Sequence, residues 1–184
     1  MSKADEYRHL NEEIKQNSTI SQNVFVANVA VTAGLIGYGL DSGKAAIFLA
    51  PFAIIVPSLF FLASQLESTT RIAAYIAVFL EGDNPSLNWE TRWFHLRRDG
   101  LLPSRRKYTP SLSGLYGLIS VVCILLARQY WIEPWWWFLI AVIPIALLVG
   151  LGVRSLLRAF AMDFIEEYVN AWENLKSSES GDAA

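Results

Sequence analysis

The chain has 184 residues, of which 53% are hydrophobic and 17% are charged, and its formal net charge is -2. A soluble domain of this size usually carries about 25% charged residues, so the composition disfavours a soluble globular protein. The nearly balanced charge gives no indication of a nucleic-acid-binding chain. Between Ser111 and Val153, Arg128 and Glu133 are the only Asp, Glu, Lys or Arg residues, a distribution typical of membrane proteins.

Residues 1–22 are polar and predict a cytoplasmic N-terminal helix. Tyr7, Leu10 and Ile14 recur at helical spacing and give this helix one apolar stripe. The first apolar run begins about twenty residues into the chain. A cleavable signal peptide has its apolar region closer to the start, so we expect none.

Four apolar segments are long enough to span a bilayer, which takes about 20 helical residues. Short links, "DSGK" and "RQYWIEP", join them in pairs and predict two helical hairpins, residues 23–63 and 111–153. Pro134 suits the first turn of the last span. Trp131 and the three Trp residues that open this span predict an aromatic belt at the membrane interface. The predicted spans are Asn23–Leu40, Ala45–Ala63, Leu112–Ala127 and Trp135–Val153.

The positive residues predict the orientation. Thirteen of the 15 Lys and Arg residues fall in the N-terminal segment, the central loop and the C-terminal segment, whereas Lys44 and Arg128 fall in the two short links. Positive residues concentrate on the cytoplasmic side of multi-span proteins. We therefore expect both termini and the central loop in the cytoplasm.

The central loop, residues 64–110, contains a second apolar run, Ile72–Leu80. Its nine residues are too few for a span, so we expect a cytoplasmic helix that continues from the second span. "GDNP" predicts a break after this helix. Asn88 is placed to cap a short helix, "WETRWFHLRR", which follows the break.

Residues 154–176 predict a cytoplasmic amphipathic helix, and residues 177–184 a disordered tail. The apolar stripe of this helix needs a partner, which is either another helix of the same chain or a neighbouring subunit. Its residues are Leu157, Phe160, Phe164, Tyr168, Trp172 and Leu175. The predicted fold is thus an all-α integral membrane protein with four transmembrane helices in two hairpins. Cytoplasmic helices lie between the hairpins and at both ends.

Three polar residues of the first hairpin are candidates for lining a pore. Asn28 and Thr32 lie one turn apart in the first span, and Asp41 lies at its outer end, where a ring of such residues in an oligomer would attract cations. Hydrogen bonding between helices explains Asn28 and Thr32 equally well. Glycines in the first and third spans permit close helix approach, either within one chain or between subunits: Gly34, Gly37, Gly39, Gly114 and Gly117.

The central loop also carries a basic cluster with two Trp residues. Such a cluster binds a phosphate-bearing ligand by charge pairing and base stacking, or anionic lipid of the inner leaflet. Both possibilities stay open. The residues are Trp89, Arg92, Trp93, Arg97, Arg98, Arg105, Arg106 and Lys107.

Catalytic motifs are not evident in the sequence. It has no HExxH, no CxxC, no phosphate-binding glycine loop and no nucleophile elbow. The lone Cys123 lies in an apolar run and is expected to be a small buried hydrophobe. We expect no enzyme activity, no metal site and no cofactor.

Two segments of the first half carry a family resemblance. "EYRHLNEEI" and "RIAAYIAVFLEGDNPSLNWE" resemble a group of small bacterial multi-span membrane proteins with a Tyr-x-x-Leu-x-x-Glu-Ile helix and an Ile-x-x-Tyr-Ile…Glu…Pro-x-Leu-x-Trp-Glu segment. The matching positions are Tyr7, Leu10, Glu13, Ile14, Ile72, Tyr75, Ile76, Glu81, Pro85, Leu87, Trp89 and Glu90. Proteins of this kind are similar to membrane effectors of anti-phage defence, including the Hailong type. The resemblance implies an oligomeric channel controlled by the product of a cytoplasmic nucleotidyltransferase.

The leading hypothesis is therefore a homo-oligomeric inner-membrane protein that forms a gated ion channel. Its cytoplasmic helices would sense a nucleotide or oligonucleotide signal, or a nucleotidyltransferase partner. The alternative is a non-conducting membrane scaffold that docks a cytoplasmic partner protein on the central loop and the C-terminal helix.

Overall fold

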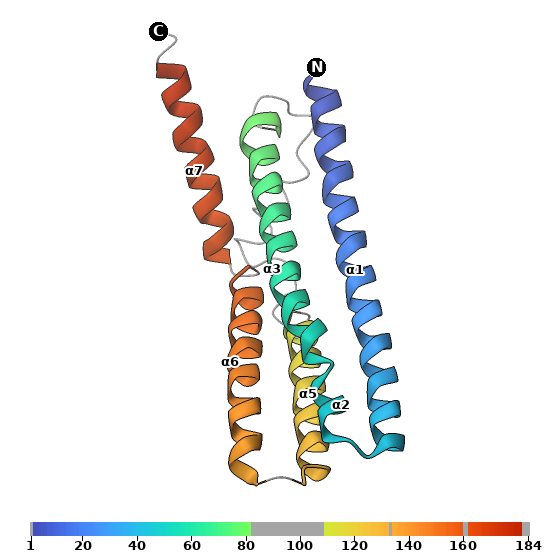
Figure 1. Ribbon diagram of the computed structural model, residues 1–184. Helices are drawn as coiled ribbons and strands as arrows, with labels where there is room; N and C mark the ends of the chain where they lie inside the picture. The colour runs from blue at the N-terminus through green and yellow to red at the C-terminus, as the bar shows by residue number, and fades with distance from the viewer. Residues whose placement is uncertain (1, 82–108, 133, 160–161, 182–184) are drawn as a thin grey trace. The chain divides into compact units, whose positions relative to one another are not determined.

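The structure is a computed structural model that describes residues 2–81, 109–132, 134–159 and 162–181 (Figure 1). These residues form helices and short links, without a strand among them. The helices are α1 (Lys3–Ser42), α2 (Ala45–Leu49), α3 (Phe52–Tyr75), a π-helix η1 (Ile76–Glu81), α5 (Thr109–Gln129), α6 (Trp135–Ala159) and α7 (Met162–Gly181).

The all-α class predicted from the sequence is confirmed for the described residues. Three helical runs are long and apolar enough to cross a membrane: α1, the run Ala45–Glu81 and α6. A shorter apolar stretch, Gly114–Gln129, lies in α5. The arrangement of four spans in two hairpins stays a prediction.

The helix α1 is continuous over 40 residues, so the N-terminal helix and the first span are one element. It begins with a capping arrangement in which the Ser2 hydroxyl accepts from the Asp5 amide and donates to the Asp5 carboxylate. It ends at Gly43, whose φ of 65° is the left-handed conformation that glycine adopts readily after a helix. A helix of this length measures about 60 Å, twice the thickness of a hydrocarbon core.

The second helical run is interrupted at Ala50 and Pro51, where a proline has no amide to donate. From Phe52 the helix passes through the predicted end of the second span and reaches Tyr75, and η1 extends it to Glu81. The predicted continuation beyond Ala63 is therefore confirmed. The predicted break at "GDNP" lies outside the described residues.

The chain divides into two compact units, which we describe separately. The apolar unit comprises Ile20–Ala63 and Lys107–Leu157, and the polar unit comprises Met1–Thr19, Ser64–Arg106 and Arg158–Ala184. The helices α1 and α3 contribute residues to both units.

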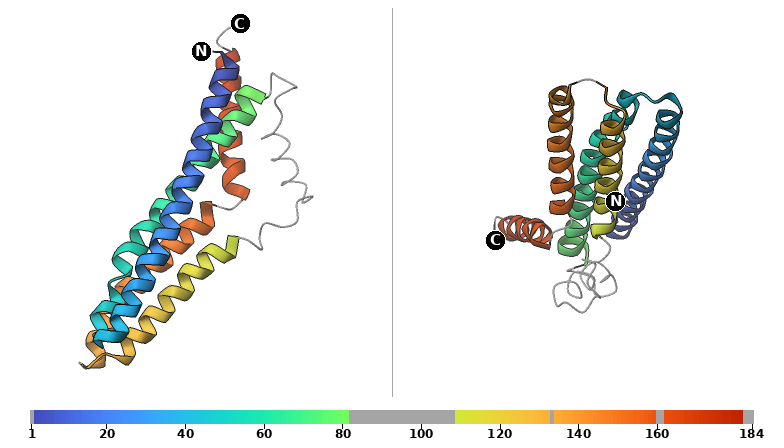
Figure 2. Two further views of the ribbon diagram at one scale, coloured as in Figure 1. Left: turned by 90° about the vertical axis from the view of Figure 1, so that its right-hand side faces the viewer. Right: turned by 90° about the horizontal axis from the view of Figure 1, so that it is seen from below.

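Close helix contacts hold the apolar unit together, and α2 packs on α5 (Figure 2). A Cβ atom at Gly39 would lie 2.7 Å from Cε1 of Phe48, and one at Gly152 would lie 2.9 Å from Cβ of Leu59. Phe48 also stacks on Tyr130, with ring centroids 5.3 Å apart. Only glycine permits helices to approach so closely, which explains two of the glycines in these apolar helices.

The outer surface of the apolar unit is itself apolar. Leu118, Leu125 and Leu147 are each at least 60% exposed, and many further Val, Ile and Leu side chains are exposed around them. A monomeric soluble protein rarely exposes a contiguous apolar surface of this kind. The surface is consistent with surrounding lipid.

In the polar unit, α7 packs on η1. Ile76, Val78, Leu80 and Glu81 of η1 are buried. Two residues of the apolar stripe predicted on the C-terminal helix, Tyr168 and Trp172, therefore have partners in their own chain, the first of the two possibilities left open. Leu157 of this stripe lies in α6 and is exposed. The side chains of Phe160 and Phe164 lie outside the described part of the chain. Within that stripe Leu175 is exposed.

The C-terminal helix differs from the prediction in its bounds. The helix α6 extends to Ala159, α7 begins at Met162, and α7 continues to Gly181 rather than ending at Lys176. The hydroxyls of Ser177 and Ser178 donate to the carbonyls of Asn174 and Leu175 one turn earlier. The helix therefore extends into the segment predicted to be disordered.

Candidate functional site

Four polar side chains are buried on α1 and α5, in a unit that is otherwise apolar. Asn28 and Thr32 lie one turn apart on α1, and Tyr116 and Ser120 lie one turn apart on α5. Their exposed fractions are 5%, 3%, 1% and 4%. We call this set the polar seam, and it is the candidate functional site.

The seam is joined by one hydrogen bond between the helices. Asn28 Nδ2 donates to the Tyr116 hydroxyl oxygen at 2.9 Å, and Ser120 Oγ donates to the Tyr116 carbonyl at 2.8 Å. The Phe25 ring meets the Tyr116 ring nearly edge-on, with centroids 5.8 Å apart. Because a buried amide without a partner destabilises a fold, the pairing explains how Asn28 is tolerated here.

The bond between Asn28 and Tyr116 is the interhelical alternative that the sequence left open. In the single chain both Asn28 and Thr32 are buried, so pore lining by them stays a prediction that requires the seam to open. Asp41 is exposed at the end of α1. Tyr116 and Ser120 were not predicted, although a Tyr and a Ser one turn apart in an apolar helix are the signal that could have identified them.

A row of small side chains runs along α1 between Ala27 and Asp41. Its residues are exposed, recur at alternating intervals of three and four, and form what we call the small face: Ala27, Ala30, Gly34, Gly37 and Asp41. No described atom lies within 4 Å of a Cβ atom built at Gly34 or Gly37. The same holds for Gly114 and Gly117 of α5. Of the predicted close-approach glycines, only Gly39 closely contacts another part of the chain that the structure describes.

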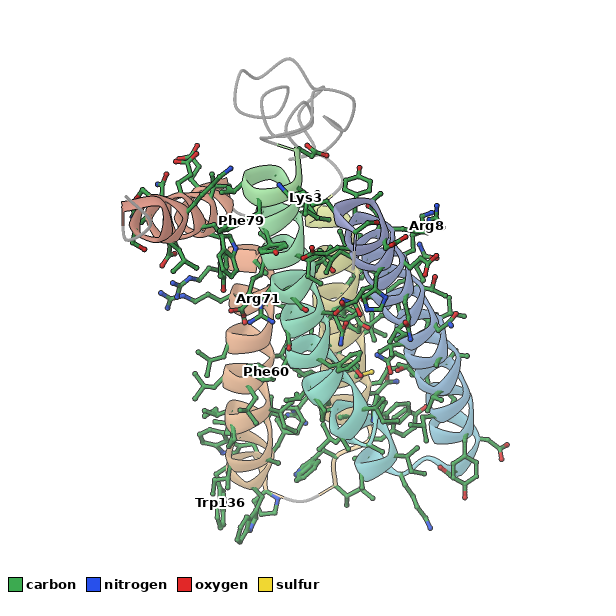
Figure 3. The ribbon with its side chains drawn as sticks, turned by 90° about the horizontal axis from the view of Figure 1, so that it is seen from above. Lys3, Arg8, Phe60, Arg71, Phe79 and Trp136 are labelled. Carbon is green, nitrogen blue, oxygen red and sulfur yellow. The ribbon has the colours of Figure 1, made fainter. Side chains whose placement is uncertain are left out.

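Aromatic residues gather at the link between α5 and α6. Trp136 and Trp137 are exposed and stack with centroids 4.4 Å apart, and Trp136 extends from the end of α6 (Figure 3). Trp131 is instead half-buried and packs edge-on against Phe138 at 5.3 Å. Gly43 and Tyr130 approach each other, so the two short links lie at the same end of the apolar unit.

In the polar unit, aromatic side chains join η1 and the end of α3 to α7. The Trp172 ring meets Tyr75 at 5.4 Å and Phe79 at 5.9 Å, both nearly edge-on, while Tyr75 and Phe79 stack at 5.0 Å. The Tyr75 hydroxyl donates to Glu6 Oε1 on α1 at 2.8 Å. Tyr75 therefore ties three helices together.

A second tyrosine holds α7 closer to its start. The Tyr168 hydroxyl donates to Glu67 Oε1 of α3 at 2.9 Å. Burial raises the pKa of the Tyr168 phenol above its ordinary value of 10.0, and the hydrogen bond to the Glu67 carboxylate raises it further. Arg71 opposes these effects. The neutral phenol is favoured because only this form can donate to the carboxylate.

The predicted basic cluster, from Trp89 to Lys107, lies outside the described residues. Binding of anionic lipid and binding of a phosphate-bearing ligand by this cluster therefore both stay predictions. Among the described residues, no group of three or more His, Cys, Asp or Glu side chains is placed to hold a metal ion.

Fold and seam together define the class: an all-helical chain with three helices long and apolar enough to cross a membrane and a polar contact inside its apolar unit. Comparison with family models, with curated proteins and with solved structures gives no match.

Proposed function

We propose that the chain is a multi-pass protein of the bacterial inner membrane with four spans, and with both termini and residues 64–110 in the cytoplasm. The distribution of Lys and Arg supports this orientation. The exposed apolar surface and the exposed Trp residues at one end support insertion in lipid. The 21 residues of α5 correspond to about 30 Å of helix, enough for a fourth crossing.

The second part of the proposal is self-association through α1. In lipid, helices associate through close packing of small residues rather than through the hydrophobic effect. The small face of α1 offers such a surface, and Gly34 and Gly37 have no neighbour there among the described residues. Copies of the chain would meet along this face and bring the Asp41 residues of several subunits near one another.

The third part is a gated pore, and the buried polar seam is the observation that carries it. Polar side chains are unfavourable inside an apolar membrane unit unless they bond to each other or line a path for water. In the resting chain Asn28 is bonded to the Tyr116 hydroxyl, and Ser120 to the Tyr116 carbonyl. On opening, α1 would separate from α5, so that Asn28, Thr32, Tyr116 and Ser120 line a wet path with Asp41 at its outer mouth.

The signal that opens this pore would reach the cytoplasmic parts of the chain. The resemblance to anti-phage membrane effectors makes a nucleotide or an oligonucleotide the candidate signal, supplied by a nucleotidyltransferase. The basic cluster from Trp89 to Lys107 has the chemistry to receive it, because guanidinium groups pair with phosphates and Trp rings stack on bases. The protein would then act as a candidate defence effector.

The test is single-channel recording in planar bilayers of the wild type, Tyr116→Phe and Tyr38→Phe. The first substitution leaves the Asn28 amide without its partner in the resting state, whereas Tyr38 is exposed and provides the matched control. Interhelical hydrogen bonds in membranes contribute about 0.6–1.5 kcal/mol, so Tyr116→Phe should raise the open probability about threefold to tenfold. Tyr38→Phe should leave it unchanged.

Silent membranes for all three proteins would contradict the pore. They would favour the alternative, a non-conducting scaffold whose cytoplasmic surface docks a partner protein. Equal open probabilities for the wild type and Tyr116→Phe would show conduction but would remove the polar seam from the gating mechanism.

A further inference from the structure

We infer that α7 is a regulatory latch, which clasps η1 through Lys176 and Trp172 and so keeps the chain in its resting state. The clasp is a contact between two elements of the polar unit. Its regulatory role rests on the proposed pore. Neither residue belongs to the polar seam, so the two ideas can be tested separately.

Lys176 caps the end of η1 from a distant part of the sequence. The last four carbonyls of a helix lack partners within that helix, and Val78 is among the last four residues of η1. Lys176 Nζ donates to the Val78 carbonyl at 2.9 Å and lies 5.9 Å from the centroid of the Phe79 ring. A cation at a helix C-terminus is favoured by the helix dipole as well.

Trp172, one turn before Lys176, secures the same face of α7. It packs edge-on against Tyr75 and Phe79, and Figure 3 shows Phe79 between η1 and α7. Its Nε1 is buried without a hydrogen-bond acceptor among the described residues. An unsatisfied donor weakens the docked state, because in water the same group would be bonded. The aromatic contacts nevertheless hold this face of α7 against the end of α3 and against η1.

The segment under the latch, η1, is a π-helix. A π-helix is rare, contains more residues per turn than an α-helix and occurs frequently at functional sites. Conversion of η1 to an α-helix would shift its register by one residue, a rotation of about 100°. Lys176 bonds to the Val78 carbonyl near the end of η1, so the docked latch anchors this end of the segment.

The latch acts on a helix that also serves the apolar unit. The run η1 continues α3 without a break, and α3 supplies Phe52–Ala63 to the apolar unit. A change of register in η1 therefore acts on an element that reaches the proposed membrane spans. Release of α7 is the step that would permit this change.

The experiment compares wild type, Lys176→Met, Lys176→Arg and Glu173→Gln in lipid nanodiscs and planar bilayers. Lys176→Met keeps the aliphatic stem and removes the donor, Lys176→Arg restores a cationic donor, and Glu173 is an exposed control on the same helix. A hydrogen bond to a charged group is worth about tenfold or more in an equilibrium. Lys176→Met should therefore speed amide hydrogen exchange in Ile76–Glu81 about tenfold and raise the open probability.

Lys176→Arg and Glu173→Gln should behave like the wild type in both measurements. Unchanged exchange in Lys176→Met would overturn the clasp. Faster exchange with an unchanged open probability, in membranes where the wild type shows channel events, would overturn its regulatory role and leave the pore intact. Faster exchange with silent membranes for the wild type, Tyr116→Phe and Lys176→Met alike would overturn the pore, and the regulatory role with it.

Trp172→Leu is a second, independent test of the latch. It removes the aromatic edges against Tyr75 and Phe79 but keeps an apolar side chain on α7. The latch predicts a rise in exchange and in open probability in the same direction as for Lys176→Met. If neither the exchange rate nor the open probability rises in Trp172→Leu, the latch is contradicted.

Discussion

Two glycines of α1, Gly37 and Gly39, have opposite surroundings. A Cβ atom at Gly39 would lie 2.7 Å from Cε1 and 2.9 Å from Cζ of Phe48, whose side chain is fully buried. A Cβ atom at Gly37 would meet no described atom within 4 Å. The same substitution at the two positions therefore separates packing within the chain from the helical preference of the residue.

Gly39→Ala should lower the free energy of unfolding by about 1–3 kcal/mol, because the buried Phe48 ring must shift to admit the methyl group. In the detergent-solubilised monomer, Gly37→Ala should leave this free energy unchanged or raise it by up to about 1 kcal/mol, since alanine favours a helix. Tryptophan fluorescence during titration with a denaturing detergent measures both. Equal losses for the two variants would contradict the packing described for Gly39.

At this scale the sequence identified the residue types but not their partners. The polarity of Asn28 and Thr32 marked them as candidates, yet Tyr116 lies 88 positions away from Asn28. Its partnership depends on the register of α1 against α5, which no local pattern encodes. Likewise, five glycines looked equivalent in sequence, and only the position of the Phe48 ring distinguishes Gly39 from the others.

At the scale of elements, the hydrophobic pattern predicted where helices occur better than where they begin and end. It predicted the helix that continues beyond Ala63, because a nine-residue apolar run is too short to cross. It did not anticipate that α1 is one helix of 40 residues, since the change from polar to apolar composition does not itself break a helix. The hydrophobic pattern did not anticipate the π-helical form of η1 either.

The docking of α7 should depend on pH through Tyr168. Its pKa is raised in the folded chain by burial and by the Glu67 carboxylate, so the docked state is favoured fully below the ordinary value of 10.0. That contribution is lost as the pH rises through the raised pKa. The difference in phenolate absorbance between the wild type and Tyr168→Phe reports the ionisation of Tyr168, and it should therefore show a titration above pH 10. Between pH 6 and 9 the docking of α7 should not change.

Glu67→Gln provides the matched variant for this titration. It keeps an acceptor for the Tyr168 hydroxyl but removes the negative charge, so the pKa of Tyr168 should move back toward its ordinary value. A wild-type titration at or below 10, or one that Glu67→Gln does not lower, would contradict the contact.

At the scale of the whole molecule, composition and charge distribution predicted a membrane protein, and the described helices agree with that class. Hydropathy alone could not decide how many helices cross. Three helical runs are long and apolar enough to cross a membrane, whereas the described apolar part of α5, Gly114–Gln129, is shorter than these runs. The pore and the regulatory role of the latch both depend on a fourth crossing, because α5 contributes half of the polar seam.

Accessibility of single cysteines in intact cells tests this topology most directly. Cys123→Ala removes the native thiol, and one exposed position at a time then receives a cysteine: Ser18, Lys44, Ile132 or Glu173. Four crossings predict that an impermeant maleimide labels Lys44→Cys and Ile132→Cys in intact cells, and the other two only after lysis. Labelling of Glu173→Cys but not of Ile132→Cys in intact cells would mean that α5 does not cross, and would contradict the account.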